Sequence, residues 1–428
     1  MIRSFQTFPL SNFSETKLQM LNWGNRFNIC VFLDNNQYQL QNHSYECLAG
    51  VGSVASIKAN AGNALQQLQS FLDEQNDWCF GHLGYNLKNE TEQVTALHAD
   101  IIGFPDLFFF VPQYVIQFNE QELKIGSFTN DHAEILHQIL QTAVTVDAKP
   151  TSIEIKERVS KEAYITAIEK IKQHILRGDC YELNYCMEFF AEEVLLDAVK
   201  VYASLVNISP NPFAAFYKVD NSYLLCASPE RFLRKKEMAL LSQPIKGTVR
   251  RERNNPIADE LRKQELYNST KDRSENVMVV DLVRNDLSRV CKKGTVRVDE
   301  LFGIYTFPQV HQMISSVSGT VKDELNFADI IRATFPMGSM TGAPKQKVMQ
   351  LIDEYEQTPR GIFSGAVGYI SPNGDFDLNV VIRSILYNAN SNYLSYRVGS
   401  GITFYSNAEK EYEECLLKAE AIKEVLHC

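Results

Sequence analysis

The last third of the chain carries its clearest folding signal, because three strand-forming runs alternate there with turn residues. One run covers 366–370 and ends at a Pro-Asn-Gly turn, a second covers 378–387, and a third covers 393–398 after an asparagine-rich turn. Turn residues of this kind between strand-forming runs are typical of antiparallel hairpins. The segment therefore predicts an antiparallel meander that leads into Gly399-Ser400-Gly401.

Strand-forming runs also dominate the first third of the chain, at 27–33, 78–85, 105–115 and 122–128. Between the first two of these runs, leucines recur at helical spacing, which predicts a helix at 63–75. A histidine in the second run, His82, could be a ligand, but we interpret it as structural.

Three further helices are predicted from capping residues and apolar periodicity. Ser160 can cap the first, which Gly178 would stop. The second covers 274–290. The third begins at Ser406, where Glu409 three residues later would complete a capping box.

The charge and cysteine content exclude several classes of protein. A net charge of -10 disfavours nucleic acid and anionic membranes as partners. The sequence shows neither an apolar run long enough to span a membrane nor a secretory signal. The nine cysteines include no Cys-x-x-Cys pair, so we expect neither a disulfide framework nor a zinc site. We expect a cytoplasmic protein.

A candidate nucleophile, Lys246, stands between a proline and a glycine-threonine pair in Pro244-Ile245-Lys246-Gly247-Thr248. Proline fixes one backbone dihedral, and glycine lets the main chain approach a ligand. A lysine that is desolvated there would lose proton affinity and could attack an electrophile. Taken alone, these residues also fit an ordinary surface lysine in a turn.

Carboxylates occur where two predicted helices should pack. Glu275 points toward the packed side of its helix, and Glu411 and Glu414 share a face with Cys415 in the last helix. Buried carboxylates are costly unless a cation or a metal ion pairs with them. The alternative is a solvated acidic first turn, which the helix dipole favours.

Six motifs occur in one order along the chain: Ser228-Pro229-Glu230-Arg231-Phe232, Pro244 to Thr248, Asp281 to Leu287, Gly338 to Lys345, Val381-Ile382-Arg383-Ser384 and Gly399-Ser400-Gly401. Together they resemble the chorismate-utilising enzymes, which include the component I subunits of anthranilate and aminodeoxychorismate synthases and the isochorismate and salicylate synthases. The resemblance implies an α+β fold with two packed antiparallel β-sheets and helices on the outside. It is strong from about residue 155 onward, so we divide the chain into an N-terminal component I-type region, 1–145, and a chorismate-binding catalytic region, 155–428.

The resemblance also implies a magnesium ion held by Glu275 and Glu414, with Glu411 in support. Mg²⁺ would offset these carboxylates and hold a carboxylate of the chorismate dianion. The planar, permanently charged fork of Arg383 suits a second carboxylate. His311 is expected beside the ring, with a structural histidine as the alternative. The implied substrate contacts are Gly247, Thr248, His311, Tyr369, Arg383, Gly399, Ser400 and Gly401.

Lys246 selects the aminodeoxychorismate synthase branch, since the anthranilate synthases resemble this segment but usually carry alanine. The implied role is attack on C2 of chorismate with loss of the C4 hydroxyl, after which ammonia enters at C4. Glu230 matches the acid that would protonate the leaving hydroxyl, unless it only pairs with Arg231 or another cation. Glu182 stands where the water-using members carry lysine and the amine-using members usually glutamine.

The ammonia needs a source, and no glutaminase segment with a nucleophilic cysteine is recognisable in the sequence. We therefore expect a separate glutamine amidotransferase partner and a product on the way to 4-aminobenzoate and folate. Two alternatives remain at this stage: an anthranilate synthase component I, or a non-catalytic chorismate-binding subunit.

Overall fold

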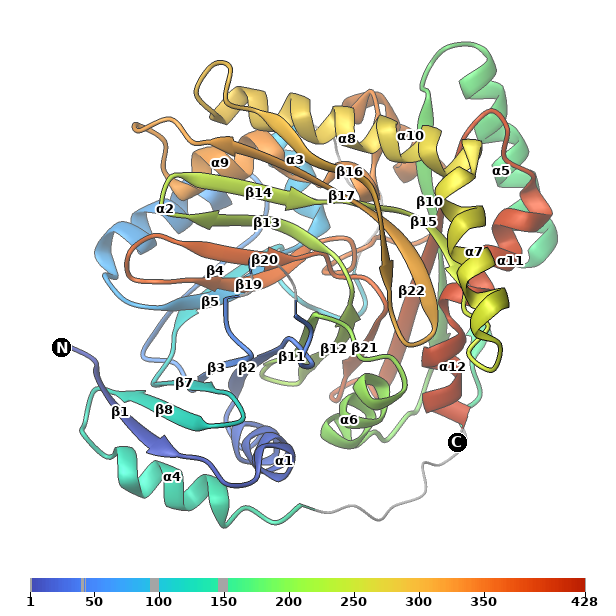
Figure 1. Cartoon of the computed structure of the whole chain (residues 1–428). Helices are drawn as coiled ribbons and strands as arrows, with labels where there is room; N and C mark the ends of the chain where they lie inside the picture. The colour runs from blue at the N-terminus through green and yellow to red at the C-terminus, as the bar shows by residue number, and fades with distance from the viewer. Residues whose placement is uncertain (1, 40–41, 43, 93–99, 145–152, 428) are drawn as a thin grey trace.

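The computed structural model describes residues 2–39, 42, 44–92, 100–144 and 153–427. Over these residues the chain forms two antiparallel sheets (Figure 1). The larger has twelve strands in the order β1-β8-β7-β3-β2-β11-β12-β21-β22-β10-β18, with β9 paired to β10. Its strands are β1 Ser4–Pro9, β2 Ile29–Asp34, β3 Cys47–Val51, β7 Tyr114–Phe118, β8 Glu122–Ser127, β9 Lys156–Glu157, β10 Glu182–Ala191, β11 Phe213–Val219, β12 Ser222–Ser228, β18 Gly342–Ala343, β21 Ser384–Asn388 and β22 Tyr393–Ile402.

The smaller sheet has ten strands within the same described ranges, in the order β15-β17-β14-β13-β20-β19-β5-β6-β4, with β16 paired to β17. Its strands are β4 Ala55–Ala59, β5 Cys79–Leu83, β6 Leu107–Val111, β13 Arg231–Lys236, β14 Ala239–Gln243, β15 Ile245–Arg250, β16 Arg297–Thr306, β17 Val310–Thr320, β19 Ala366–Ile370 and β20 Phe376–Asn379.

Apolar side chains from both sheets meet in one core, to which Leu48 contributes from the larger sheet and Phe80 and Leu378 from the smaller. Helices α2, α8 and α9 add to this core, and α1, α4, α5, α6, α10, α11 and α12 join a second core with the larger sheet. The predicted α+β fold of two packed sheets with outer helices is confirmed. The helices are α1 Phe13–Gly24, α2 Ala64–Glu74, α3 Lys88–Thr91, α4 His132–Leu140, α5 Lys161–Leu176, α6 Ala198–Ile208, α7 Pro256–Asn268, α8 Thr270–Val290, α9 Phe327–Thr334, α10 Lys345–Tyr355, α11 Ala408–Lys418 and α12 Glu420–His427, with 3-10 turns η1 Tyr85–Leu87 and η2 Gly338–Met340.

Both sheets combine strands from the two ends of the chain. In the larger sheet β2 pairs with β11, and in the smaller sheet β5 pairs with β19. The boundary predicted between 1–145 and 155–428 falls largely on residues 145–152, which lie outside the described residues.

The meander predicted from 366 onward differs from the structure in one respect. The run 378–387 is not one strand, because β20 ends at Asn379 in the smaller sheet and β21 begins at Ser384 in the larger. Val380 is fully buried at the crossing, so the apolar run continues through the break. The crossing ends at Arg383, which has a left-handed φ of 51°. The change of sheet thus fixes the backbone at a predicted site residue.

Helix ends agree with the capping predictions in the first case and differ in the last. The Ser160 hydroxyl accepts a hydrogen bond from the Ala163 N–H at 3.2 Å, as predicted. The helix predicted from Ser406 corresponds to α11, which begins later than predicted, because Asn407, not Ser406, accepts from an N–H of its first turn. Ser406 instead accepts from the Thr403 N–H at 3.1 Å. Short polar side chains compete for such positions, and the sequence alone did not rank these two.

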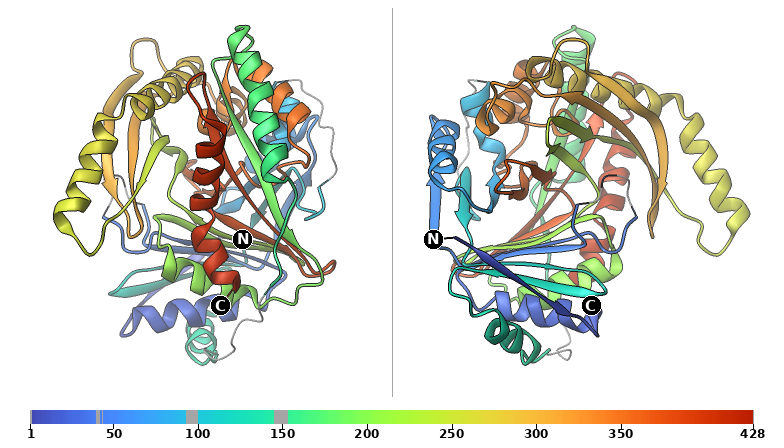
Figure 2. Two further views of the ribbon diagram at one scale, coloured as in Figure 1. Left: turned by 90° about the vertical axis from the view of Figure 1, so that its right-hand side faces the viewer. Right: turned by 60° about the vertical axis from the view of Figure 1, so that its left-hand side comes forward.

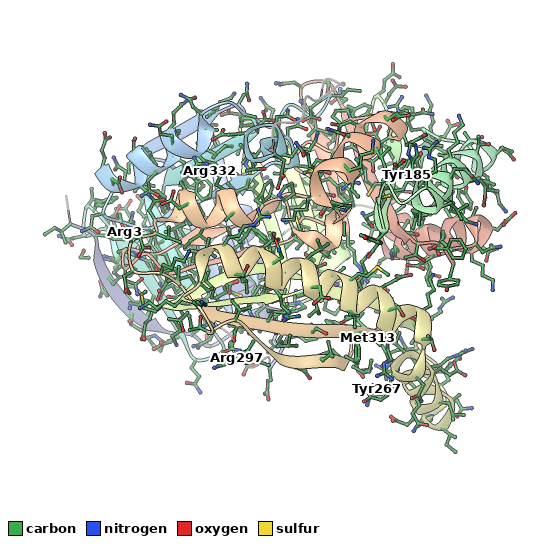
Figure 3. The ribbon with its side chains drawn as sticks, turned by 90° about the horizontal axis from the view of Figure 1, so that it is seen from above. Arg3, Tyr185, Tyr267, Arg297, Met313 and Arg332 are labelled. Atoms are coloured by element: carbon green, nitrogen blue, oxygen red, sulfur yellow. The ribbon has the colours of Figure 1, made fainter. Side chains whose placement is uncertain are left out.

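The region before α8 holds a helix that the sequence did not predict. α7 lacks a regular apolar stripe, and only Leu266 is buried along its length. α8 begins at Thr270, four residues before the predicted start, with Ser269 as its cap. Figure 3 shows Tyr267 at the projecting corner of the molecule that α7 forms.

Two smaller predictions also have outcomes. His82 is fully buried, with Nδ1 2.9 Å from the Tyr217 hydroxyl oxygen and Nε2 2.8 Å from the Pro105 carbonyl oxygen, so it is structural. The eight described cysteines are all buried and form no disulfide. No helix within the described ranges has the length and apolar character that a membrane span requires.

Candidate active site

A cavity of about 100 Å³ lies where β15 of the smaller sheet approaches β10 and β22 of the larger. It adjoins a second cavity of about 620 Å³, which shares four of its lining residues, Thr248, Arg383, Glu414 and Lys418. The left view of Figure 2 shows α11 and α12 between α5 and the edge of the smaller sheet that carries α7. Chemically capable side chains line the smaller cavity: Glu230, Lys246, Thr248, Asp272, Glu275, Gln312, Ser339, Arg383, Glu414 and Lys418.

Lys246 reaches the cavity from an irregular strand. The pairing of β15 with β17 shifts register between Ile245 and Thr248, and Gly247 has a φ of 93°. A β-carbon on Gly247 would lie 3.0 Å from Cβ of Asp272, so this position needs glycine for both its backbone and its space. The bulge presents the lysine side chain to the cavity.

The Lys246 amine is held by a carboxylate from the other sheet. Nζ lies 2.6 Å from Oε1 of Glu182, whose side chain is 2% exposed. Burial alone would lower the pKa of Lys246, but the charges of Glu182, Glu275 and Glu414 outweigh burial and raise the pKa above its ordinary value. We predicted that desolvation lowers the proton affinity of this lysine. That prediction is wrong, because the negative charges of three carboxylates raise the pKa by more than burial lowers it.

Glu230 occupies the connection between β12 and β13 and is buried against the same cavity. Burial raises the pKa of its carboxyl to about 7, although the positive charges of Lys246 and Arg383 oppose the shift. Arg231 is not its partner, because Nε and Nη2 of that arginine each donate to Asp377 at 2.9 Å. A carboxyl that is half protonated near neutral pH can donate a proton to a leaving group.

Glu275 and Glu414 also line the cavity, from α8 and α11. Burial raises the pKa of Glu275 to about 7, because the opposing charges of Lys246 and Lys271 only partly offset it. For Glu414 the net effect has the opposite sign. Burial would raise its pKa, but Lys418, whose Nζ lies 2.8 Å from Oε1, together with Lys271 and Lys246 outweighs burial and holds the pKa below its usual value.

These carboxylates fit a hard divalent cation. Oε1 of Glu275 is buried without a hydrogen-bond donor, and its nearest cation, Lys271 Nζ, is 3.8 Å away. Carboxylate oxygens that lack a protein partner are the ligands Mg²⁺ prefers, with water and substrate completing the shell. Glu411 is further from this role, because Oε1 accepts from Lys271 at 2.8 Å and Oε2 from Ser400 at 2.5 Å.

The three glutamates do not gather as a closed metal cluster. In the described part of the chain, the one group of at least three potential ligands with donor atoms within 4.8 Å of one another is Asp34, Glu46 and Cys47, which lies elsewhere. A magnesium ion here would rely on Glu275 and Glu414 rather than on a closed cluster of three protein carboxylates.

Arg383 is the cation without a fixed partner at this site. Burial lowers its pKa to about 10, against the attraction of Glu230 and of Tyr38. Within the described ranges, no carboxylate lies within ion-pair distance of its guanidinium. Its fork is therefore free to bind a carboxylate of a ligand.

Gly247, Thr248, Arg383, Gly399 and Gly401 all line the cavity, as the sequence predicted, but three other predicted contacts do not. These three are His311, Ser400 and Tyr369. For His311 and Ser400 the next residues in the strand line the cavity instead, since alternate residues face opposite sides of a sheet.

His311 faces away from the cavity. Its Nε2 lies 3.0 Å from Oδ1 of Asp259 and its Nδ1 3.0 Å from the Thr306 hydroxyl oxygen. The next residue in β17, Gln312, lines the cavity instead. The expected contact between His311 and a ring in this cavity is therefore wrong, because the strand turns Gln312, and not His311, toward the cavity.

Ser400 and Tyr369 are also placed elsewhere. Ser400 lies between two glycines that face the cavity, and its hydroxyl donates to Glu411 behind the strand. Tyr369 packs against the rings of Tyr45 and Trp78 and lines a separate cavity of about 60 Å³. Neither side chain reaches Lys246, so the two predicted substrate contacts are corrected.

Comparison with known proteins identifies the family of the chain. A family model described as chorismate binding enzyme matches residues 29–424. The chain belongs to the chorismate binding enzymes. The match begins within the N-terminal region, where the resemblance from the sequence is weaker, and strands from that region belong to both sheets of the fold.

Several relatives of this chorismate binding enzyme carry one name. The chain is 34% identical over 344 residues to aminodeoxychorismate synthase component 1 of Klebsiella aerogenes. The match covers 80% of this chain and 75% of the relative. The chain is also 34% identical over 372 residues to the chloroplastic aminodeoxychorismate synthase of Arabidopsis thaliana, covering 81% of this chain. This chain spans only 40% of the length of that plant relative.

A solved structure supports the fold of this chorismate binding enzyme. Anthranilate synthase component I from Streptococcus pneumoniae superimposes with a TM-score of 0.78 at 24% identity. The match covers 90% of this chain and 94% of that one. At this identity the likeness concerns the fold alone.

Six charged or polar residues of this chorismate binding enzyme's cavity were not predicted from the sequence: Asn184, Asp272, Gln312, Ser339, Arg397 and Lys418. Asp272 lies one turn before Glu275 and Lys418 one turn after Glu414, so helical spacing could have found both. Ser339 belongs to the Gly338 to Lys345 motif and could have been included with it. Gln312 gave no signal, because the register of β17 decides which residue faces inward.

Proposed function

We propose that the chain is the chorismate-converting component of an aminodeoxychorismate synthase. It would combine chorismate with ammonia to give 4-amino-4-deoxychorismate, a precursor of 4-aminobenzoate and folate. One observation carries the proposal: an amine, Lys246, and a carboxyl with a raised pKa, Glu230, line the same cavity as two glutamates suited to a cation.

The proposed reaction uses two of these side chains directly. The Lys246 amine forms a bond to C2 of the ring while the C4 hydroxyl departs, and Glu230 protonates that hydroxyl so that it leaves as water. Ammonia then forms a bond to C4, and the bond from C2 to Lys246 breaks. Hydroxide is a poor leaving group, which is why a carboxyl protonated near neutral pH matters here.

Arg383 and the proposed metal site would bind the substrate dianion. The free guanidinium of Arg383 would bind one carboxylate in a bidentate manner. Glu275 and Glu414 would hold Mg²⁺, which would supply positive charge for a second carboxylate of the substrate. Gly399 and Gly401 leave room for the ligand against β22.

A separate glutamine amidotransferase is the proposed source of ammonia, in keeping with the component 1 name of the Klebsiella aerogenes relative. The proposed setting is the cytoplasm. Buried, unbonded cysteines favour a reducing compartment, because thiols are kept reduced there.

The test is product analysis with chorismate, Mg²⁺ and an ammonium salt. We expect 4-amino-4-deoxychorismate and no pyruvate. Anthranilate with release of pyruvate would contradict the proposal and support an anthranilate synthase component I. Absence of turnover despite chorismate binding would support a non-catalytic binding subunit.

A further inference from the structure

The proposed reaction gives Lys246 a role but gives none to Glu182, the residue with which it forms an ion pair. Lys246 lines the cavity, whereas Glu182 does not. The lysine side chain is 10% exposed and the glutamate side chain 2%. Glu182 therefore lies behind the amine relative to the cavity, and we expect it to act on a substrate through Lys246.

The surrounding backbone leaves space for this pair. Gly401 stands opposite Asn184 in the pairing of β10 with β22. A β-carbon on Gly401 would lie 2.5 Å from Lys246 Nζ and 2.8 Å from Glu182 Oε1. Only glycine fits there without displacing the two charged groups, so the sheet is shaped around their contact.

A charged amine cannot attack carbon until it loses a proton, and several groups face Lys246. Charged groups that line the same cavity include Glu275 from α8, Glu414 and Lys418 from α11, and Glu230 from the connection before β13. Of the carboxylates in the described ranges, Glu182 alone has an oxygen within ion-pair distance of Nζ, at 2.6 Å. That distance allows direct proton transfer without an intervening water.

Proton transfer within this pair also avoids a change in buried charge. An ammonium beside a carboxylate and an amine beside a carboxylic acid have the same total charge. Oε2 of Glu182 is buried and has no hydrogen-bond partner, so the contact of this carboxylate within the cavity wall is the one that Oε1 makes with Lys246 Nζ. Removal of the proton to solvent would instead leave Glu182 as an uncompensated buried charge, which is costly.

We propose that Glu182 is the positioning residue of the nucleophile: it holds Lys246 and takes the proton that the amine must lose before it attacks. This inference rests on the proposed function. The Lys246 ammonium gives a proton to Glu182, and the free amine forms the bond to C2. When ammonia has bonded to C4, Lys246 departs with the electron pair of the C2–N bond and regains its proton from Glu182. The proton given by Glu230 to the departing hydroxyl returns from the ammonium formed at C4.

The experiment measures the covalent adduct directly. Wild type, Glu182→Gln, Glu182→Asp and the exposed control Glu192→Gln are mixed with chorismate and Mg²⁺ without ammonia. Adduct formation is followed by intact-protein mass spectrometry between pH 6.5 and pH 9. At pH 7 we expect Glu182→Gln to react on the order of 10²-fold more slowly than wild type, the lower end of a general base contribution. Glu182→Asp should keep part of the rate, and the control all of it.

The pH profile separates proton transfer from packing. The rate for Glu182→Gln should rise about tenfold per pH unit, because solvent must then remove the proton, while the wild-type rate rises less steeply. A Glu182→Gln variant that reacts as fast as wild type at pH 7, or faster, overturns the inference. So does an equal slowing at every pH.

Two outcomes do not depend on folding of the variants. A wild-type rate that itself rises tenfold per pH unit overturns the inference, and so does the absence of an adduct on wild type. Products formed by wild type with an ammonium salt test the proposed function separately. If wild type forms 4-amino-4-deoxychorismate and Glu182→Gln forms the adduct as fast as wild type, the proposed function stands and only the role of Glu182 is contradicted.

Discussion

Arg231 forms a bidentate ion pair with Asp377, with both N···O distances at 2.9 Å, and this pair leaves the adjacent Glu230 without an arginine partner. Glu230 is then buried against the cavity with a pKa raised to about 7 by burial. Two adjacent residues thus have different roles: Arg231 forms a structural ion pair, and the carboxyl of Glu230 can exchange a proton.

Replacement of Glu230 by Gln should lower kcat with chorismate and ammonia by about 10²- to 10⁴-fold, because the leaving hydroxyl loses its proton donor. KM for chorismate should change little, since the amide keeps the shape of the carboxyl. Wild-type kcat should decline above pH 7, where the carboxyl ionises. Steady-state kinetics between pH 6 and pH 9 test both points, and an active Glu230→Gln variant would exclude the acid role.

The same substitution should affect stability in the opposite direction. The folded-state pKa of Glu230, about 7, is above the ordinary 4.5, so its protonation favours the folded state below pH 4.5 and this contribution is lost as pH rises through 7. A shift of this size corresponds to about 3 kcal/mol. Glu230→Gln should therefore unfold at a higher temperature than wild type at pH 8.5 and at a similar temperature at pH 4.5. Lower stability of the variant at pH 8.5 would contradict the burial of an ionisable carboxyl.

Metal binding should depend on Glu275. Mg²⁺ that binds only the folded protein raises the midpoint of thermal unfolding. We expect a rise with millimolar Mg²⁺ for wild type and for the exposed control Glu192→Gln, and none for Glu275→Gln. Calorimetric titration with Mg²⁺ gives the same comparison without turnover. An unchanged response in Glu275→Gln would move the metal site elsewhere.

Gly401→Ala tests the space around the nucleophile. The new methyl group would lie 2.5 Å from Lys246 Nζ, and both close neighbours are the ends of side chains, so the fold can persist while the ion pair moves. We expect kcat to fall with little change in the unfolding midpoint. Retention of full activity would mean that the position of the lysine amine is not critical.

The fold followed from local patterns wherever those patterns lie within one sheet. The strand at 27–33 and the helix at 63–75 correspond to β2 and α2, because alternation and leucine spacing directly report a buried face. The run 378–387 misled the prediction, since residues buried between two sheets are apolar whichever sheet they join. Such a crossing depends on long-range pairing, which no local pattern encodes.

The candidate site shows the same division. Lys246, Glu230 and the glutamates proposed to hold a metal ion were singled out by their motifs and by the family resemblance, and all but Glu411 line the cavity. His311 and Ser400 failed because a strand turns neighbouring residues to opposite faces. The register of β17 and β22 decides which residue faces inward, and it follows from pairing across the sheet rather than from the residue itself.

The central claim is that the amine of Lys246 bonds to the substrate ring. Wild type incubated with chorismate and Mg²⁺ in the absence of ammonia should gain the mass of chorismate less one water, and Lys246→Ala should keep its original mass. Peptide mapping should place the added mass on Lys246. Equal, unmodified masses for wild type and Lys246→Ala, under conditions in which wild type turns over once ammonia is added, would contradict the claim.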